Sequence, residues 1–148
     1  MSTNQSAMLE RSLSADTTYD GLKFKADRIT LQQSPNYFSI DARQGIGQKT
    51  KSINFVVNSD LVSGRYRLGV GPKIEHGSGT AYFFSPILGG EGGQLTFYAF
   101  VGFLTITVDE QSNSLHGHFE WESAAIPEHG VPEKTYVKDG ELFIPDLR

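Results

Sequence analysis

The amino-acid sequence predicts an all-β fold, either an antiparallel β-sandwich or a flattened barrel of about eight to ten strands. Short runs in which apolar and polar residues alternate cover most of the chain, as expected for strands with one buried face. Clusters such as QGIGQK, NSDLVSG and DEQSNS separate these runs and are rich in turn-forming residues. No long run has the periodicity of an amphipathic helix, so we expect turns alone to join the strands.

The expected strands follow one another closely along the chain. The first covers residues 22–31, and its apolar positions change parity near Arg28, which indicates a bulge or bend there. The others are expected at residues 37–43, 53–57, 66–70, 80–85, 95–100, 103–108 and 115–122, with one bent strand or a hairpin over residues 136–144.

The start of the chain lacks this alternation. Its larger apolar residues are Met8, Leu9 and Leu13, which bury too little area to offset the entropy of ordering the segment. We therefore predict a flexible N-terminal arm over residues 1–18 that is dispensable for folding. The remaining residues, 19–148, form a single β domain, as the length of 148 residues suggests.

The composition excludes several classes of function. The chain has no cysteine, which excludes a disulfide scaffold, a cysteine zinc site and a cysteine nucleophile. A net charge of −4 argues against a nucleic-acid partner. The longest apolar stretch, residues 97–108, is too short for a membrane helix, and no secretory signal is evident, so we expect a cytoplasmic protein without membrane association. No serine-nucleophile or phosphate-loop motif is present, which favours a non-enzymatic protein without a cofactor.

The segment LHGHFEWE offers one candidate for a binding site. On a strand, alternate residues share a face, so Phe119 and Trp121 are predicted to be buried while His116 and His118 lie on the opposite face. Two imidazoles at this spacing can reach one metal ion if a third ligand comes from a neighbouring strand or loop. The candidates for that third ligand are Asp109, Glu110, Glu120, His76 and His129. The alternative, which we favour, is a row of solvent-facing polar residues without a metal.

A second candidate comes from consecutive aromatic residues. Tyr82 is followed by two phenylalanines, and Tyr98 lies in a similar cluster within residues 97–103, so these side chains cannot all face one core. Either both faces of these strands are covered, or some aromatic side chains are exposed. Exposed, Tyr82 and Tyr98 could stack on a sugar ring, or the patch could form a homo-oligomer interface.

The C-terminal half of the chain resembles a family of small, uncharacterised bacterial all-β proteins, many of them lipoproteins. The resemblance rests on GRYRLG, TAYFF, GFLTITVD, LHGHFEW and YVKDGELFI in that order. It implies an all-β fold and no particular activity. The chain differs from the lipoprotein members because it lacks a signal and a lipid-bearing cysteine, so surface anchoring is not implied.

Two functions of different classes follow from these patterns. The first is a non-enzymatic binding or interaction module, whose partner is a protein, a glycan or a second copy of the chain. The second is a small metal-binding protein or metal-dependent enzyme centred on His116 and His118.

Overall fold

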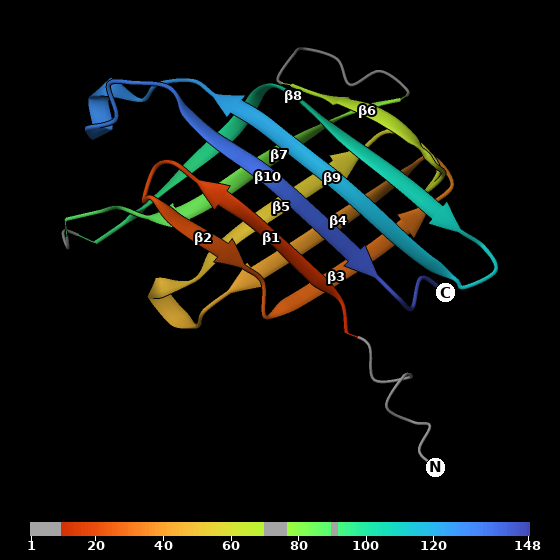
Figure 1. Cartoon of the computed structure of the whole chain (residues 1–148). Coiled ribbons are helices and arrows are strands. Elements are labelled where there is room, and N and C mark those ends of the chain that lie inside the picture. The colour runs from red at the N-terminus through yellow and green to blue at the C-terminus, as the bar shows by residue number, and fades with distance from the viewer. Residues whose placement is uncertain (1–9, 70–76, 90–91) are drawn as a thin grey trace.

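Ten β-strands form one continuous sheet that curls into a half-barrel (Figure 1). The structure is a computed structural model and describes residues 10–69, 77–89 and 92–148. The strands are β1 (Ser12–Thr17), β2 (Leu22–Lys25), β3 (Arg28–Ser34), β4 (Tyr37–Gln44), β5 (Lys51–Val57), β6 (Gly64–Leu68), β7 (Ser78–Pro86), β8 (Gln94–Asp109), β9 (Ser114–Ser123) and β10 (Thr135–Ile144). Two short 3₁₀ turns, η1 (Gly47–Lys49) and η2 (Pro127–His129), are the only helical elements within the described ranges.

The sheet order is β2-β1-β10-β9-β8-β6-β7-β5-β4-β3. Most neighbours are antiparallel, because turns join strands that are consecutive or nearly so in the chain. The exception is the short β6, which pairs antiparallel with the second half of β8 and parallel with the start of β7. The first half of β8 pairs directly with β7. The same edge of β8 therefore pairs with β7 along its first half and with β6 along its second half.

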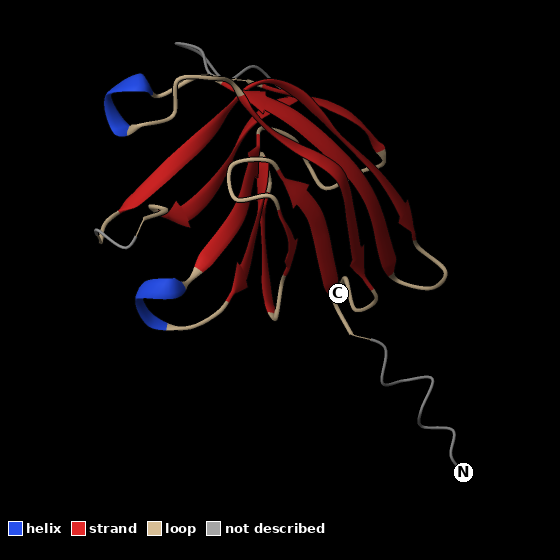
Figure 2. Ribbon diagram, turned by 60° about the vertical axis from the view of Figure 1, so that its left-hand side comes forward, coloured by secondary structure: helices blue, strands red, loops and turns tan. Residues whose placement is uncertain are grey.

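The two edges of the sheet meet at one corner of the half-barrel. The edge strands β2 and β3 are consecutive in sequence and separated only by Ala26 and Asp27. The amide of Ala26 donates to the carbonyl of Leu13 on β1, and the amide of Asp27 donates to the carbonyl of Arg43 on β4. The chain therefore crosses from one wall to the other within two residues, and Figure 2 shows the resulting curvature.

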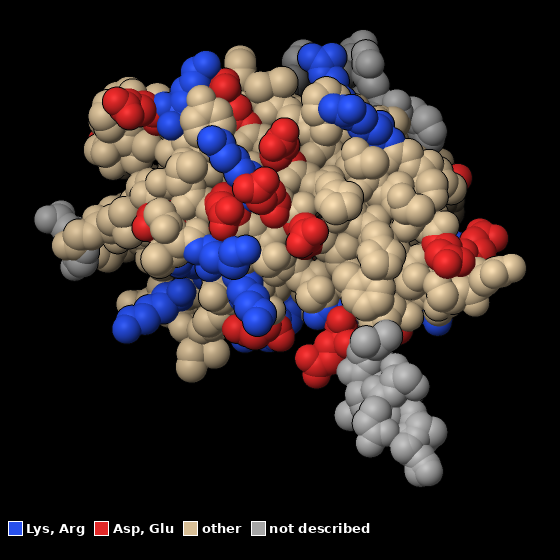
Figure 3. All heavy atoms as spheres, viewed as in Figure 1, with Lys and Arg blue, Asp and Glu red and all other residues tan. Residues whose placement is uncertain are grey.

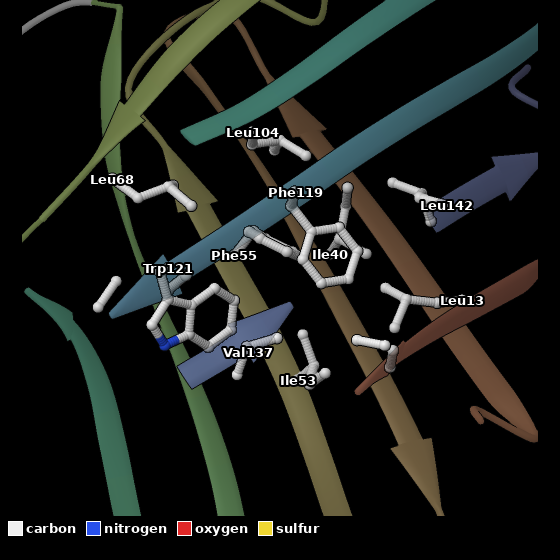
Figure 4. Close-up of a cluster of buried hydrophobic side chains, with 14 of the residues drawn as sticks. Leu13, Ile40, Ile53, Phe55, Leu68, Leu104, Phe119, Trp121, Val137 and Leu142 are labelled. Atoms are coloured by element: carbon white, nitrogen blue, oxygen red, sulfur yellow. The ribbon is translucent and has the colours of Figure 1, made fainter. Parts of the chain in front are cut away.

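The inner face of the curled sheet holds a single apolar core (Figure 4). Alternate residues of every wall point into it, as the period of two in a strand requires. Phe55 of β5 packs edge-to-face against Phe119 and Trp121 of β9, which lie on the opposite wall. These aromatic contacts hold the two walls of the half-barrel together.

The N-terminal segment corrects one prediction. Residues 12–17 are not an arm but the strand β1, which lies between β10 and the edge strand β2. Leu13 and Ala15 are fully buried and pack in the core. Residues 1–9 lie outside the described part of the chain. Buried and more exposed residues alternate along β1, but several of them, such as Ser14 and Ala15, are small. The contrast between apolar and polar side chains is therefore weak, and the sequence does not reveal the strand.

Other expectations are confirmed or changed in detail. The all-β class is confirmed, and the architecture is one curled sheet rather than the two separate sheets of a sandwich. The parity change near Arg28 marks the crossing between two edge strands instead of a bend within one strand. The two strands expected over residues 95–108 are one long strand with a bulge between Ala99 and Val101. Residues 135–144 form one strand, which also contains a bulge.

Candidate functional site

Strand β8 presents a row of apolar side chains on the outer, convex face of the sheet. Ala99 and Gly102 point into the core, and the bulge between them turns both Phe100 and Val101 outward. Tyr98, Phe100, Val101 and Phe103 are 54%, 58%, 44% and 38% exposed, respectively. From Tyr98 to Phe103 this row is roughly 16 Å long at the usual rise of a strand. We call these four residues and the neighbouring Tyr82 the aromatic face.

Tyr82 and Tyr98 are directly opposite each other on β7 and β8. Their ring centroids are 5.6 Å apart and their planes are inclined by 57°, so the two rings do not form one flat platform. Burial raises the pKa of the Tyr82 hydroxyl, as do the charge of Asp41 and the neighbouring Tyr98, while Arg43 opposes the shift. Tyr82 therefore remains a neutral hydroxyl at physiological pH and adds no charge to the aromatic face.

The polar residues beside Tyr82 already have partners. Asn54, which is opposite Tyr82 on β5, donates to the hydroxyl of Ser52 at 2.9 Å. Asp41, which is opposite Asn54 on β4, forms an ion pair with Arg43 at 3.1 Å. A sugar stacked on Tyr82 or Tyr98 would have to compete with these contacts for its hydrogen bonds.

Charges of opposite sign flank the aromatic face at Phe103. On the β6 side Arg67 is directly opposite Phe103, and the guanidinium of Arg65 lies 3.8 Å from the centre of the Phe103 ring. On the β9 side Glu120 is directly opposite Phe103, and Glu122 is opposite Val101. Figure 3 shows the basic side chains over β6 at the upper margin and acidic ones over β9 and β10 nearer the centre.

Phe103 stands between two hollows in the outer surface. One, of about 300 Å³, is lined by Val101, Phe103, Glu120, Glu122, Tyr136 and Lys138 among others. The other, of about 320 Å³, is lined by Arg65, Phe103, Thr105, His118, Glu120 and Asp139 among others. The Phe103 side chain is thus a ridge with a depression on each side along the strand.

The two predicted histidines lie where the alternation placed them. His116 and His118 are exposed on the outer face, while Phe119 and Trp121 are buried in the core. The ring of His116 packs against Phe143 of β10, with centroids 4.7 Å apart. His118 lines the second hollow together with Arg65, whose positive charge disfavours a cation there.

No third ligand joins the two histidines. Within the described ranges, no group of three or more histidine and carboxylate side chains is arranged to hold a metal ion. Asp109 accepts hydrogen bonds from the amides of Ser112 and Gln111 in the turn after β8, and these bonds lower its pKa. His129 belongs to η2, beyond the other end of β9 from His116, and His76 lies outside the described residues.

The sequence identified part of this surface. It singled out Tyr82 and Tyr98 and placed residues 97–103 in a patch that could join two copies, but it did not connect this patch with the charges on β6 and β9. The pairing of β6 with β8 places Arg67 beside Phe103, although they are far apart in sequence, and no local pattern indicates this. The break in alternation at Phe100 and Val101 was the available signal for the bulge.

Comparisons with family models, with curated proteins and with solved structures found no match to this chain. The resemblance of the C-terminal half to small bacterial all-β proteins therefore stays a prediction. Within the described ranges, no helix has the length and apolar character needed to cross a membrane.

Proposed function

We propose that the protein is a non-enzymatic interaction module that binds protein through the aromatic face. The observation that carries this proposal is the uninterrupted row of Tyr98, Phe100, Val101 and Phe103, each more than one third exposed, along a single strand. Exposed apolar patches of this kind mark protein–protein contacts, in which phenylalanine and tyrosine are enriched.

A protein partner suits this surface better than a glycan. Phe100, Val101 and Phe103 carry no hydrogen-bonding group in their side chains, whereas a sugar needs several donors and acceptors around the ring that it stacks on. The polar residues at the tyrosine end, Asn54 and Asp41, are already engaged in contacts with Ser52 and Arg43. A metal function has less support, since His116 and His118 lack a third ligand in the described part of the chain.

Site-specific photocross-linking in cells tests this function. A benzophenone amino acid placed at residue 100 should give protein adducts, and the Phe103→Ser substitution in the same chain should reduce them. The matched control carries the probe at Ile46, which is 79% exposed but lies outside the aromatic face. Adducts of equal yield from residues 46 and 100, or none from residue 100, would contradict the proposal.

A further inference from the structure

We infer that the partner of the aromatic face is a second copy of this chain, bound in a two-fold symmetric dimer whose axis runs parallel to β8. This inference rests on the proposed function, because it names the partner of the same surface. It follows from the distribution of charge across the face, from the position of Phe103 between the charged margins and from the amount of apolar surface exposed.

The charges at the two margins are complementary to each other. Arg65 and Arg67 lie on the β6 side of β8, and Glu120 and Glu122 lie on its β9 side. A two-fold axis along β8 exchanges these two sides between copies. Arg67 of each copy therefore meets Glu120 of the other, because both residues are level with Phe103. No ion pair within the described ranges involves Arg65, Arg67 or Glu120, while Glu122 pairs with Lys134 at the margin.

The position of Phe103 between the two charged margins is also compatible with this symmetry. A rotation about an axis parallel to β8 keeps every residue at its own level along the strand, so Phe103 of one copy lies opposite Phe103 of the other. An isologous contact requires this property, because the same patch must serve both partners. A charged rim around an apolar centre is the usual arrangement of such an interface.

The exposed area sets the strength of the contact. Tyr98, Phe100 and Phe103 each expose about half of a ring that has 150–250 Å² of surface, which amounts to about 300 Å² of aromatic surface in one copy. With the surrounding arginine, glutamate and threonine side chains, the contact falls below the usual 800 Å² of each partner in a stable complex. We therefore expect a reversible dimer with a dissociation constant in the micromolar range.

Complementary charge reversals test the arrangement by sedimentation equilibrium at concentrations of about 1 to 200 μM. Arg67→Glu sets glutamate against glutamate at the level of Phe103, and Glu120→Arg sets arginine against arginine there. Each variant alone should therefore dimerise at least about fivefold more weakly than the unchanged chain. An equimolar mixture of the two variants should regain an affinity within about twofold of the unchanged chain, because arginine again meets glutamate at positions 67 and 120. Lys25→Glu and Glu128→Arg change the net charge by the same amounts at exposed positions away from the face, and they should leave the dimer unaffected.

The outcomes separate the two proposals. A chain that is monomeric throughout this range but gives photoadducts with another protein at residue 100 retains the proposed function and overturns self-association. A chain that is monomeric and gives no adducts overturns both. A dimer that neither variant weakens, or that their mixture does not restore, overturns the two-fold arrangement.

Discussion

At the scale of single residues, the ion pair between Asp20 and Lys51 links two segments that are not neighbours in the sheet. Asp20 lies in the turn between β1 and β2, and its carboxylate contacts the Lys51 ammonium at the start of β5 at 2.6 Å. The same carboxylate accepts hydrogen bonds from the hydroxyl of Thr17 and the amide of Leu22. The Asp20 side chain is only 2% exposed, so an uncharged or mispaired group there is costly.

Replacing this carboxylate should weaken the fold in a pH-dependent way. Asp20→Asn should lower the free energy of unfolding at pH 7 by roughly 1–3 kcal/mol, less than for a fully buried pair because Lys51 keeps some contact with water. Burial alone would raise the pKa of Asp20, but the hydrogen bonds from Lys51, Thr17 and Leu22 outweigh it and hold the pKa below its usual 3.8. The stabilisation is therefore present above about pH 4 and is lost as the pH falls through the lower folded pKa.

Urea denaturation of the unchanged chain and of Asp20→Asn at a series of pH values measures this effect. The difference between the two should shrink as the pH falls below 4, because the protonated carboxyl no longer forms the ion pair. A difference that stays constant across the series would show that the ion pair does not stabilise the fold.

At the same scale, alternation predicted the segment LHGHFEWE correctly, residue by residue. Phe119 and Trp121 are in the core and both histidines are outside it, because a strand leaves no other choice for neighbouring side chains. Whether a third metal ligand lies near the two histidines depends on strand pairing and turn conformation. Neither can be predicted from the sequence of one strand alone. The turn that holds Asp109 by its hydrogen bonds to Ser112 and Gln111 is an example.

At the scale of elements, the close approach of β8 and β9 depends on Gly102. A Cβ atom at this position would lie 2.7 Å from the Cα of Trp121 and would also collide with the carbonyl oxygen of Glu120. These are backbone atoms of β9, so they cannot move aside without breaking the pairing of the strands. Gly102 lies between Val101 and Phe103 and therefore holds the centre of the aromatic face in place.

Adding a methyl group at Gly102 should disturb this element strongly. Gly102→Ala should lower the free energy of unfolding by about 2–3 kcal/mol, the cost of overpacking a rigid site. Gly64→Ala on β6 is the matched control, since the nearest atom to its Cβ would be 3.6 Å away, an ordinary contact. That variant should stay within about 0.5 kcal/mol of the unchanged chain in urea denaturation. Equal effects of the two substitutions would contradict the packing described for β8 and β9.

Most strands could be predicted from the sequence, and the exceptions have physical causes. β1 was predicted as part of an arm because its inward positions include the small Ala15, while its pairing with β10 joins opposite ends of the chain. β2 and β3 were predicted as one strand because they are nearly contiguous, although they lie at opposite edges of the sheet. The order of the strands in a curled sheet depends on contacts between residues that are distant in sequence, and the local alternation of apolar and polar residues does not predict these contacts.

At the scale of the whole molecule, β8 carries apolar residues on both of its faces. The inner residues of β8 complete the core, and its outer residues form the aromatic face. The remaining outer surface of that wall carries mixed charges over β1, β2 and β10 (Figure 3). A second copy can cover the aromatic face through a two-fold axis without extending the contact into a chain of molecules.

The most direct test of this account is cross-linking of single cysteines, which the absence of native cysteine makes unambiguous. Thr105→Cys places a thiol on the outer face of β8 close to the proposed axis, and Thr30→Cys places one on the outer face of β3 in the opposite wall. A short bismaleimide can span the roughly 10 Å between two sheets packed face to face. We expect rapid covalent dimers from residue 105 and few from residue 30, whereas equal yields, or none from residue 105, would contradict the two-fold arrangement.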